Sequence, residues 1–158
     1  MHTDLVVLAM KKCTYRLVLL AFVCMMSLSF TSPVTNYYTI TVKVTNIRNS
    51  SGKLQLQIYR TAENFKKEIP WKVRLFDKNE VKNNAMTCVI TGIEPGEYGV
   101  ALLDDENSNK EMDYTMFVPD EGFGFSDYYH TAWSKPKFEN FKFQLKEDKT
   151  VTIKVRYV

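Results

Sequence analysis

An acidic, amide-rich segment, residues 104–113, holds the side chains best suited to chemistry and reads Asp-Asp-Glu-Asn-Ser-Asn-Lys-Glu-Met-Asp. Calcium takes about six to eight oxygen ligands, and alternate residues of a tight loop can turn their oxygens towards one centre. The predicted calcium ligands occupy alternate positions of such a loop: Asp105, Asn107, Asn109, the carbonyl of Glu111, and Asp113. Calcium is therefore the one cofactor that the sequence predicts.

The same segment departs from a complete calcium loop at two positions. Lys110 stands where glycine is expected, and Met116 stands where a bidentate glutamate is expected. A neighbour such as Asp104 or Asp120 would have to complete the shell. The alternative is a solvated turn in which Asp and Asn side chains cap their own backbone. Zinc and iron are disfavoured, because residues 33–158 contain only His130 and Cys88 as softer ligands.

An aromatic segment follows at residues 127–133, Asp-Tyr-Tyr-His-Thr-Ala-Trp. Exposed rings here would form a stacking platform for a sugar, a peptide or a hydrophobic partner. The candidate ligand-binding residues are Tyr128, Tyr129, His130 and Trp133. The favoured alternative is a satellite cluster that packs under a long loop. The preceding Gly-Phe-Gly-Phe-Ser, residues 122–126, is expected to be a tight loop pinned by its two phenylalanines.

The residues that could support catalysis do not form a known arrangement, so the sequence predicts that the protein is not an enzyme. His130 has no nucleophile motif around it. Asp104 and Asp105 are adjacent and would point to opposite faces of an extended backbone, so they cannot act as an acid/base pair. Ser126 lacks the context of a nucleophile elbow.

Seven short strands are expected to position these loops, since period-two alternation recurs between turn signals. They span residues 37–47, 53–59, 71–76, 85–90, 98–103, 138–145 and 149–157. The first two, separated by Asn-Ser-Ser-Gly, predict a hairpin, and residues 62–65 predict one helical turn. The pattern predicts an all-β fold, an antiparallel immunoglobulin-like or transthyretin-like β-sandwich, as one domain over residues 33–158.

Residues 1–32 read as a secretory signal peptide, with a basic segment at residues 11–16 and an apolar run from residue 17. The alternative is an uncleaved N-terminal anchor. Export to the periplasm, cell surface or medium is therefore expected, without a membrane span after cleavage. Residues 33–158 carry 18 basic and 17 acidic side chains, a net charge of +1. This balance excludes nucleic acid as an expected partner.

Four landmarks occur in one order along the chain: Thr-Val-Lys-Val-Thr-Asn-Ile-Arg-Asn-Ser-Ser-Gly, Gly-Ile-Glu-Pro-Gly-Glu-Tyr, Asp-Asp-Glu-Asn-Ser-Asn, and Pro-Asp-Glu-Gly-Phe-Gly-Phe-Ser. In these the chain resembles DUF2141, a family of exported bacterial proteins of unknown function, over about residues 38–158. The family's acidic loop usually has glycines where this chain has Ser108 and Lys110. The resemblance implies an envelope or secreted β-sandwich and brings no known activity.

Together these observations predict an exported, non-catalytic domain with a binding or structural role at the cell envelope, stabilised by calcium. The alternative function is a carbohydrate- or peptide-binding module that uses residues 128–133. An envelope protein or a glycan is the expected partner, and the oligomeric state stays open.

Overall fold

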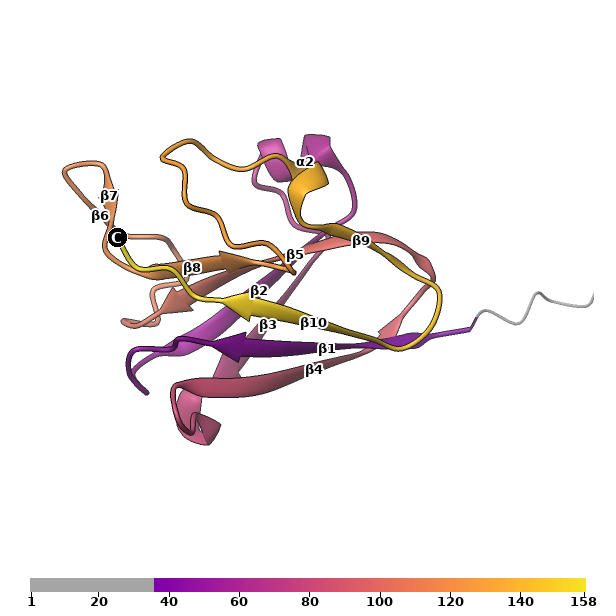
Figure 1. Cartoon of the computed structure of the whole chain (residues 1–158), viewed down its shortest axis with the longest axis horizontal. Coiled ribbons are helices and arrows are strands. Elements are labelled where there is room, and N and C mark those ends of the chain that lie inside the picture. Colours follow the sequence, from indigo (N-terminus) through magenta and orange to yellow (C-terminus); the bar gives the residue numbers. More distant parts are fainter. Residues whose placement is uncertain (1–35) are drawn as a thin grey trace, which may run out of the picture. The chain divides into compact units, whose positions relative to one another are not determined.

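The computed structural model describes residues 36–158, and ten strands dominate that region (Figure 1). The strands are β1 Tyr38–Thr45, β2 Lys53–Tyr59, β3 Lys72–Asp77, β4 Ala85–Ile93, β5 Gly96–Asp105, β6 Tyr114–Thr115, β7 Val118–Pro119, β8 Gly122–Phe125, β9 Lys142–Leu145 and β10 Lys149–Lys154. The helical elements are α2 Ala62–Lys66 and the 3-10 helices η1 Lys78–Glu80 and η2 Phe138–Asn140. The all-β prediction is confirmed. The predicted signal peptide, residues 1–32, lies outside the described residues.

Two sheets share one hydrophobic core. The smaller sheet has the order β10-β1-β4, and the larger has the order β3-β2-β5-β8, with β9 also paired to β5. Apolar side chains at alternate positions of both sheets form a single buried cluster, for example Val42 of β1, Leu56 of β2 and Leu102 of β5. In β1 and β2 the alternation therefore predicted correctly which apolar side chains face this core. These pairings do not establish an immunoglobulin-like or transthyretin-like arrangement.

The pairing of β1 differs from the prediction in two ways. β1 pairs antiparallel with β4, and it pairs parallel with β10, where Ile40 lies opposite Lys149. The sheets are therefore not antiparallel throughout. Because both edges of β1 are occupied, β2 joins the other sheet and the predicted hairpin is wrong. The chain leaves β1 through Asn46, whose φ is 64°, and the N–H of Ile47 then donates to the carbonyl of Asn84 at 2.9 Å.

The glycine-rich segment predicted as a loop is strand β8. It pairs antiparallel with β5, and Gly124 lies opposite Leu102. A Cβ on Gly124 would lie 2.4 Å from Cγ2 of Ile153, so glycine allows β10 to pass close to this strand. The strand predicted over residues 138–145 begins only at Lys142, because residues 138–140 form η2.

A second apolar cluster lies on the opposite face of the larger sheet. Its floor is formed by side chains that alternate with those of the main core, including Tyr59 of β2 and Ala101 of β5. Phe65 of α2 packs onto it, and Phe138 and Phe141 complete it around η2. The predicted helical turn is confirmed as α2. Thr61 precedes it as the N-cap residue, and its hydroxyl accepts the N–H of Asn64 at 3.1 Å.

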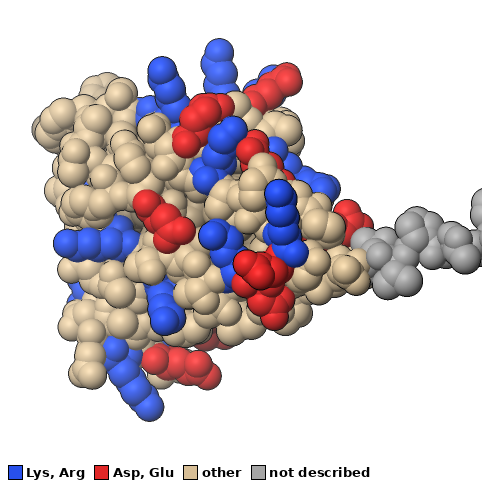
Figure 2. Space-filling view, turned by 45° about the vertical axis from the view of Figure 1, so that its right-hand side comes forward, with Lys and Arg blue, Asp and Glu red and all other residues tan. Residues whose placement is uncertain are grey.

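Charged side chains of both signs are interspersed on the face shown in Figure 2. Within residues 36–158, no helix combines the length and apolar character needed to cross a membrane.

Candidate functional site

The acidic loop follows β5 directly and is organised by Asp105. This side chain is fully buried, and its two carboxylate oxygens accept the N–H groups of Asn109 at 3.1 Å and Lys110 at 2.9 Å. Ser108 and Lys110 have φ values of 63° and 71°. The loop therefore adopts left-handed backbone at both positions where the family usually has glycine.

Three of the five predicted calcium ligands come together at Asp113. The amide of Asn107 donates to Asp113 Oδ2 at 2.6 Å, and the amide of Asn109 donates to both oxygens at 3.0 and 3.1 Å. Glu111 is exposed, and its N–H donates to Asn109 Oδ1 at 2.8 Å. No three His, Cys, Asp or Glu side chains among residues 36–158 gather closely enough to hold a metal ion. Calcium binding at this loop stays a prediction.

Glu121 lies beside this cluster, and the sequence reasoning missed it in favour of its neighbour Asp120. The side chain is 4% exposed, and its Oε1 accepts the N–H of Glu106 at 2.9 Å. Its Oε2 is buried without a hydrogen-bond partner. Burial raises the pKa of Glu121, and the charges of Asp105 and Asp113 add to the effect.

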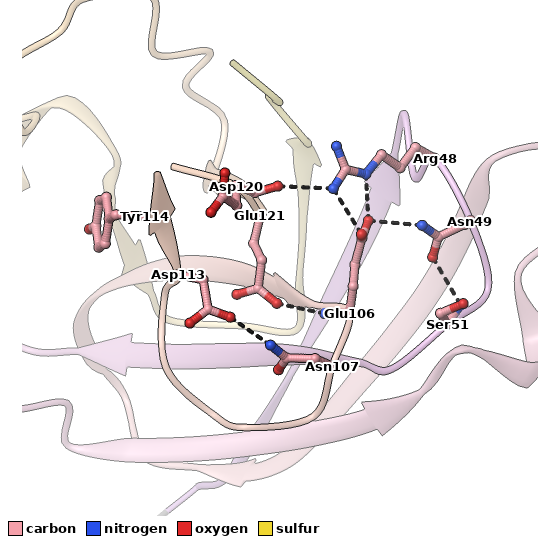
Figure 3. A pocket seen from close by; sticks show the side chains of 9 residues that line it. All are labelled: Arg48, Asn49, Ser51, Glu106, Asn107, Asp113, Tyr114, Asp120 and Glu121. Atoms are coloured by element: carbon pink, nitrogen blue, oxygen red, sulfur yellow. Dashed lines mark hydrogen bonds and ion pairs between the residues drawn. The ribbon is translucent and has the colours of Figure 1, made fainter. Parts of the chain in front are cut away.

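Figure 3 shows Glu121 and Asp113 facing the same cavity. The cavity has a volume of about 590 Å³. Its lining also includes the acidic side chains Glu106 and Asp120 and the basic side chain Arg48. The Asp120 Oδ2 is occupied, because it accepts the hydroxyl of Thr115 at 2.8 Å.

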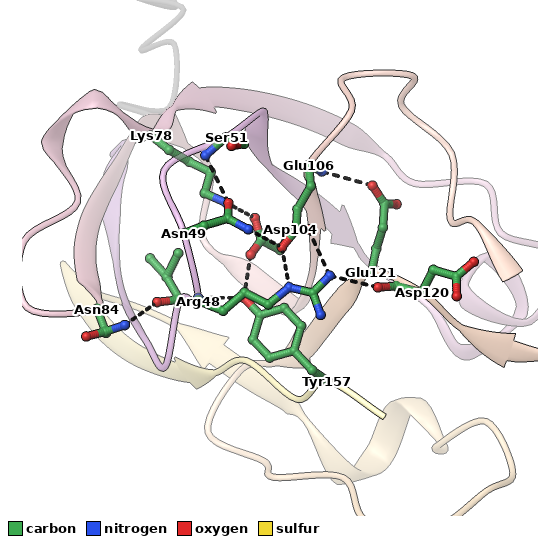
Figure 4. A network of polar contacts seen from close by, with 11 residues as sticks. Arg48, Asn49, Ser51, Lys78, Asn84, Asp104, Glu106, Asp120, Glu121 and Tyr157 are labelled. Carbon is green, nitrogen blue, oxygen red and sulfur yellow. Dashed lines mark hydrogen bonds and ion pairs between the residues drawn. The ribbon is translucent and has the colours of Figure 1, made fainter. Parts of the chain in front are cut away.

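Asp104, named as a neighbour able to complete the calcium shell, is held elsewhere. Its Oδ1 lies 2.6 Å from Nζ of Lys78, and both side chains are fully buried. The hydroxyl of Tyr157 donates to its other oxygen, and Lys78 also donates to Asn49 at 3.1 Å (Figure 4). Burial, followed by the bond to Asp104, raises the pKa of Tyr157. Asp104 therefore joins η1 and the C-terminal segment to the end of β5.

Glu106 is neutralised by Arg48. The guanidinium binds the carboxylate through two contacts, Nε to Oε1 at 2.6 Å and Nη2 to Oε2 at 2.8 Å. These bonds lower the pKa of Glu106. Arg48 also donates to the carbonyl of Asp120 at 2.9 Å, and its guanidinium lies 4.4 Å from the centre of the Tyr157 ring. Arg48 thus fastens the residues before β8 to the start of the acidic loop (Figure 4).

A second cavity, the aromatic groove, has a volume of about 640 Å³. Its floor is the second apolar cluster, including Tyr59, Phe65 and Phe125. One wall comes from the acidic loop and the β6–β7 hairpin, and the other comes from residues 130–136. Figure 1 shows both walls on the same side of the larger sheet as α2.

The four predicted aromatic-loop residues divide between this groove and its surroundings. Trp133 is 82% exposed and lines the groove. His130 also lines it but is buried, and its Nε2 lies 2.6 Å from the carbonyl oxygen of Ser134. Tyr128 packs against the second cluster, and the ring of Tyr129 lies under Nζ of Lys154 at 4.9 Å. Trp133 is therefore the predicted residue that is both exposed and in the groove.

A family model described as an uncharacterized protein conserved in bacteria, DUF2141, matches residues 42–154. The chain belongs to this family. The resemblance recognised in the sequence is thereby confirmed. No curated protein and no solved structure matches the chain. The DUF2141 match includes the acidic loop, Glu121 and both walls of the aromatic groove.

Among residues 36–158 of this DUF2141 chain, the most exposed apolar side chains lie between β6 and β7. Phe117 is 98% exposed and Met116 is 90% exposed, and both have positive φ. Phe117 lines the groove opposite the segment that carries Trp133. The sequence did not predict that these two side chains are exposed, because Thr-Met-Phe-Val has no periodicity that distinguishes an exposed turn from a short buried strand.

Proposed function

We propose that this DUF2141 domain is an exported, non-catalytic binding module of the cell envelope, whose aromatic groove takes an apolar segment of a partner protein. The observation that carries the proposal is the groove itself, with Trp133 and Phe117 exposed on its opposing walls. Exposed apolar side chains that gather around one groove mark an interaction site, whereas single ones do not. Export rests on the signal-peptide pattern of residues 1–32.

A protein segment suits the groove better than a glycan because several of its polar side chains already have partners. Lys135 donates to Glu68 at 2.7 Å and to the carbonyl of Phe65 at 3.1 Å. The side-chain oxygen of Gln57 accepts the hydroxyl of Tyr59 at 2.6 Å. A sugar needs many directed hydrogen bonds, whereas an apolar segment needs surface to cover. A glycan stacked on Trp133 is the second candidate, favoured by the exposure of its indole ring.

The non-catalytic part of the proposal is supported by the surroundings of His130. Its Nε2 is committed to the Ser134 carbonyl, and its ring packs edge-on against Phe125 with the ring centres 6.0 Å apart. These contacts suit a structural histidine rather than a general base. The proposal also includes a β-sandwich of immunoglobulin-like or transthyretin-like type and a calcium ion at the acidic loop.

The proposal is tested with peptides selected from a phage-displayed library on the purified protein. The affinity of each peptide is then measured by titration calorimetry for Trp133→Ala. Since a buried aromatic anchor contributes strongly to an interface, the dissociation constant should rise by about thirtyfold. Tyr37→Ala is the matched control, because Tyr37 is an aromatic side chain 61% exposed outside the groove.

Fluorescence provides a second readout. Trp71→Phe leaves Trp133 as the only tryptophan of the chain, and its emission should shift to shorter wavelength when a peptide covers it. Peptides that bind Trp133→Ala as tightly as the unmodified protein would contradict the proposal. Selective, Trp133-dependent binding to a glycan array would favour the glycan instead.

A further inference from the structure

Among residues 36–158, Glu121 is a buried carboxylate whose hydrogen-bonding capacity is only partly satisfied. It is 4% exposed, and its Oε2 has no hydrogen-bond partner. A buried carboxylate oxygen without a partner costs free energy, and an ion or ordered water is the usual explanation. The Asp113 carboxylate lines the same cavity as Glu121. A second negative group makes the cost larger, so the site favours a cation.

The other acidic side chains around this cavity are already occupied. Arg48 binds both oxygens of Glu106, and Thr115 donates to Asp120. Asp105 accepts two backbone N–H groups within its own loop. Asp113 also has partners, but they are the uncharged side-chain amides of Asn107 and Asn109. The carboxylate with an unpartnered oxygen is therefore Glu121, and Asp113 is the carboxylate beside it that no cation among residues 36–158 neutralises.

Two amides supply further oxygen. Asn107 and Asn109 donate their side-chain N–H groups to Asp113, and their Oδ1 atoms each accept one backbone N–H. Each amide would therefore have to release Asp113 for its oxygen to face a shared ion. An amide oxygen has two lone pairs, so one stays available on each side chain. Carboxylate and amide oxygens together, in a cavity open to water, match the preference of calcium.

We propose that Glu121 completes a divalent-cation site with Asp113, Asn107 and Asn109, and that the bound ion makes ligand binding in the aromatic groove calcium-dependent. The second half rests on the proposed function. The site differs from the predicted ligand set, because Asp105 caps the loop and Glu121 takes the position of the missing carboxylate.

The two cavities share one wall, which is how the ion would act on the groove. Asn107 and Asp113 line the ion cavity, whereas Met112 and Phe117 line the groove. Tyr114 lines both. An ion that joins Asp113 to Glu121 would therefore fix the spacing of the side chains that flank Tyr114, including those that face the ligand.

Calorimetry measures Ca²⁺ binding to the unmodified protein, to Glu121→Gln and to Glu147→Gln. Luminescence of Tb³⁺, used in place of Ca²⁺ and sensitised by Tyr114, reports binding to the same three proteins. The unmodified protein should bind Ca²⁺ with a dissociation constant of about 0.1–1 mM, as extracellular sites do. Glu121→Gln should weaken binding about tenfold or more. Glu147→Gln removes the same charge from an exposed residue outside the cavity and should bind normally.

Glu121→Gln should remain folded, because its amide oxygen can still accept the N–H of Glu106. Circular dichroism checks this, and Asp113→Asn provides a second variant with the same expected loss. Absence of Ca²⁺ binding to the unmodified protein at about 10 mM, or unchanged binding by both variants, would overturn the site.

The dependence of the groove on the ion is measured separately with a selected peptide. Ca²⁺ should strengthen peptide binding to the unmodified protein, and Glu121→Gln should need at least about tenfold more Ca²⁺ for the same effect. Trp133→Ala should lose the peptide and keep Ca²⁺ binding. Ca²⁺ binding without any effect on the peptide would overturn the coupling alone. Ca²⁺ binding with no groove-dependent peptide would count against the proposed function, and with it the coupling, and would leave the ion site standing.

Discussion

Lys110 and Ser108 show how much the acidic loop depends on an unfavourable backbone conformation. Both residues have φ above 60°, where a Cβ costs about 1–2 kcal/mol relative to the right-handed region. The bonds from the Asn109 and Lys110 N–H groups to Asp105 hold the loop in this conformation. The loop thus tolerates side chains where glycine would fit without strain.

Replacement of Lys110 by glycine should therefore stabilise the protein. The gain from relieved strain is offset in part by the greater entropy of glycine in the unfolded chain, so the free energy of unfolding should rise by up to about 1 kcal/mol. Urea denaturation of Lys110→Gly measures it. Lys137→Gly is the control, because Lys137 is exposed with a φ of −85°, and it should only lose stability. A loss in both variants would show that Lys110 is not strained.

At the scale of elements, β8 is a strand whose sequence resembles a loop. Glycine has a low propensity for strands, so local propensity does not predict β8. The glycines are explained by β10, which passes too close to leave room for a Cβ. That closeness places Ile153 against Gly124 and holds the two sheets together at the groove end of the molecule.

Gly124→Ala should consequently destabilise the protein by about 1–3 kcal/mol, since the new methyl group overlaps a packed core side chain. Thermal and urea unfolding both report the change. Gly96→Ala is the comparison, because the nearest atom to its Cβ would be 3.3 Å away on Tyr98. Equal effects of the two substitutions would mean that β8 and β10 are not packed as described.

The sequence was sufficient to predict the elements whose side chains alternate, and insufficient to predict their partners. Alternation in β1 and β2 reflects burial on one face, which is a local property. Nothing in β1 specifies that Ile40 pairs in parallel with Lys149, because backbone hydrogen bonds are alike in every strand. The hairpin prediction failed for this reason.

The candidate site was likewise predictable from the sequence only in part. Spacing along one loop predicted the cluster of Asn107, Asn109 and Asp113, because near neighbours in a tight turn must lie together. Glu121 could not be found by spacing, since it reaches the loop only through the pairing of β8 with β5 and the bond from Glu106. The groove likewise requires two loops to meet across a folded sheet.

At the scale of the whole molecule, the buried phenol of Tyr59 makes the free energy of unfolding fall as the pH rises in the alkaline range. Burial raises its pKa to about 12, and its hydroxyl donates to Gln57 at 2.6 Å. An unfolded tyrosine ionises at a pKa of about 10. The folded state therefore resists ionisation, and this contribution to stability is complete below pH 10 and is lost as the pH rises towards 12.

Between these values the free energy of unfolding should fall by up to about 1.4 kcal/mol per pH unit from this group. Urea unfolding at several alkaline pH values measures the slope. Tyr59→Phe should make the free energy of unfolding fall less steeply with pH, because this phenol no longer contributes. An unchanged slope would assign the pH dependence to other groups.

The parallel pairing of β1 with β10 also governs the order in which the molecule can fold. A nascent chain has β1 long before β10, so one edge of β1 and the core beneath it stay uncovered until the last strand of the described region has been made. During that interval the free edge of β1 can accept a strand from another chain. Completion of the smaller sheet is therefore a late event in folding, and a chain that lost β10 would leave one edge of β1 free to pair with a strand of another chain.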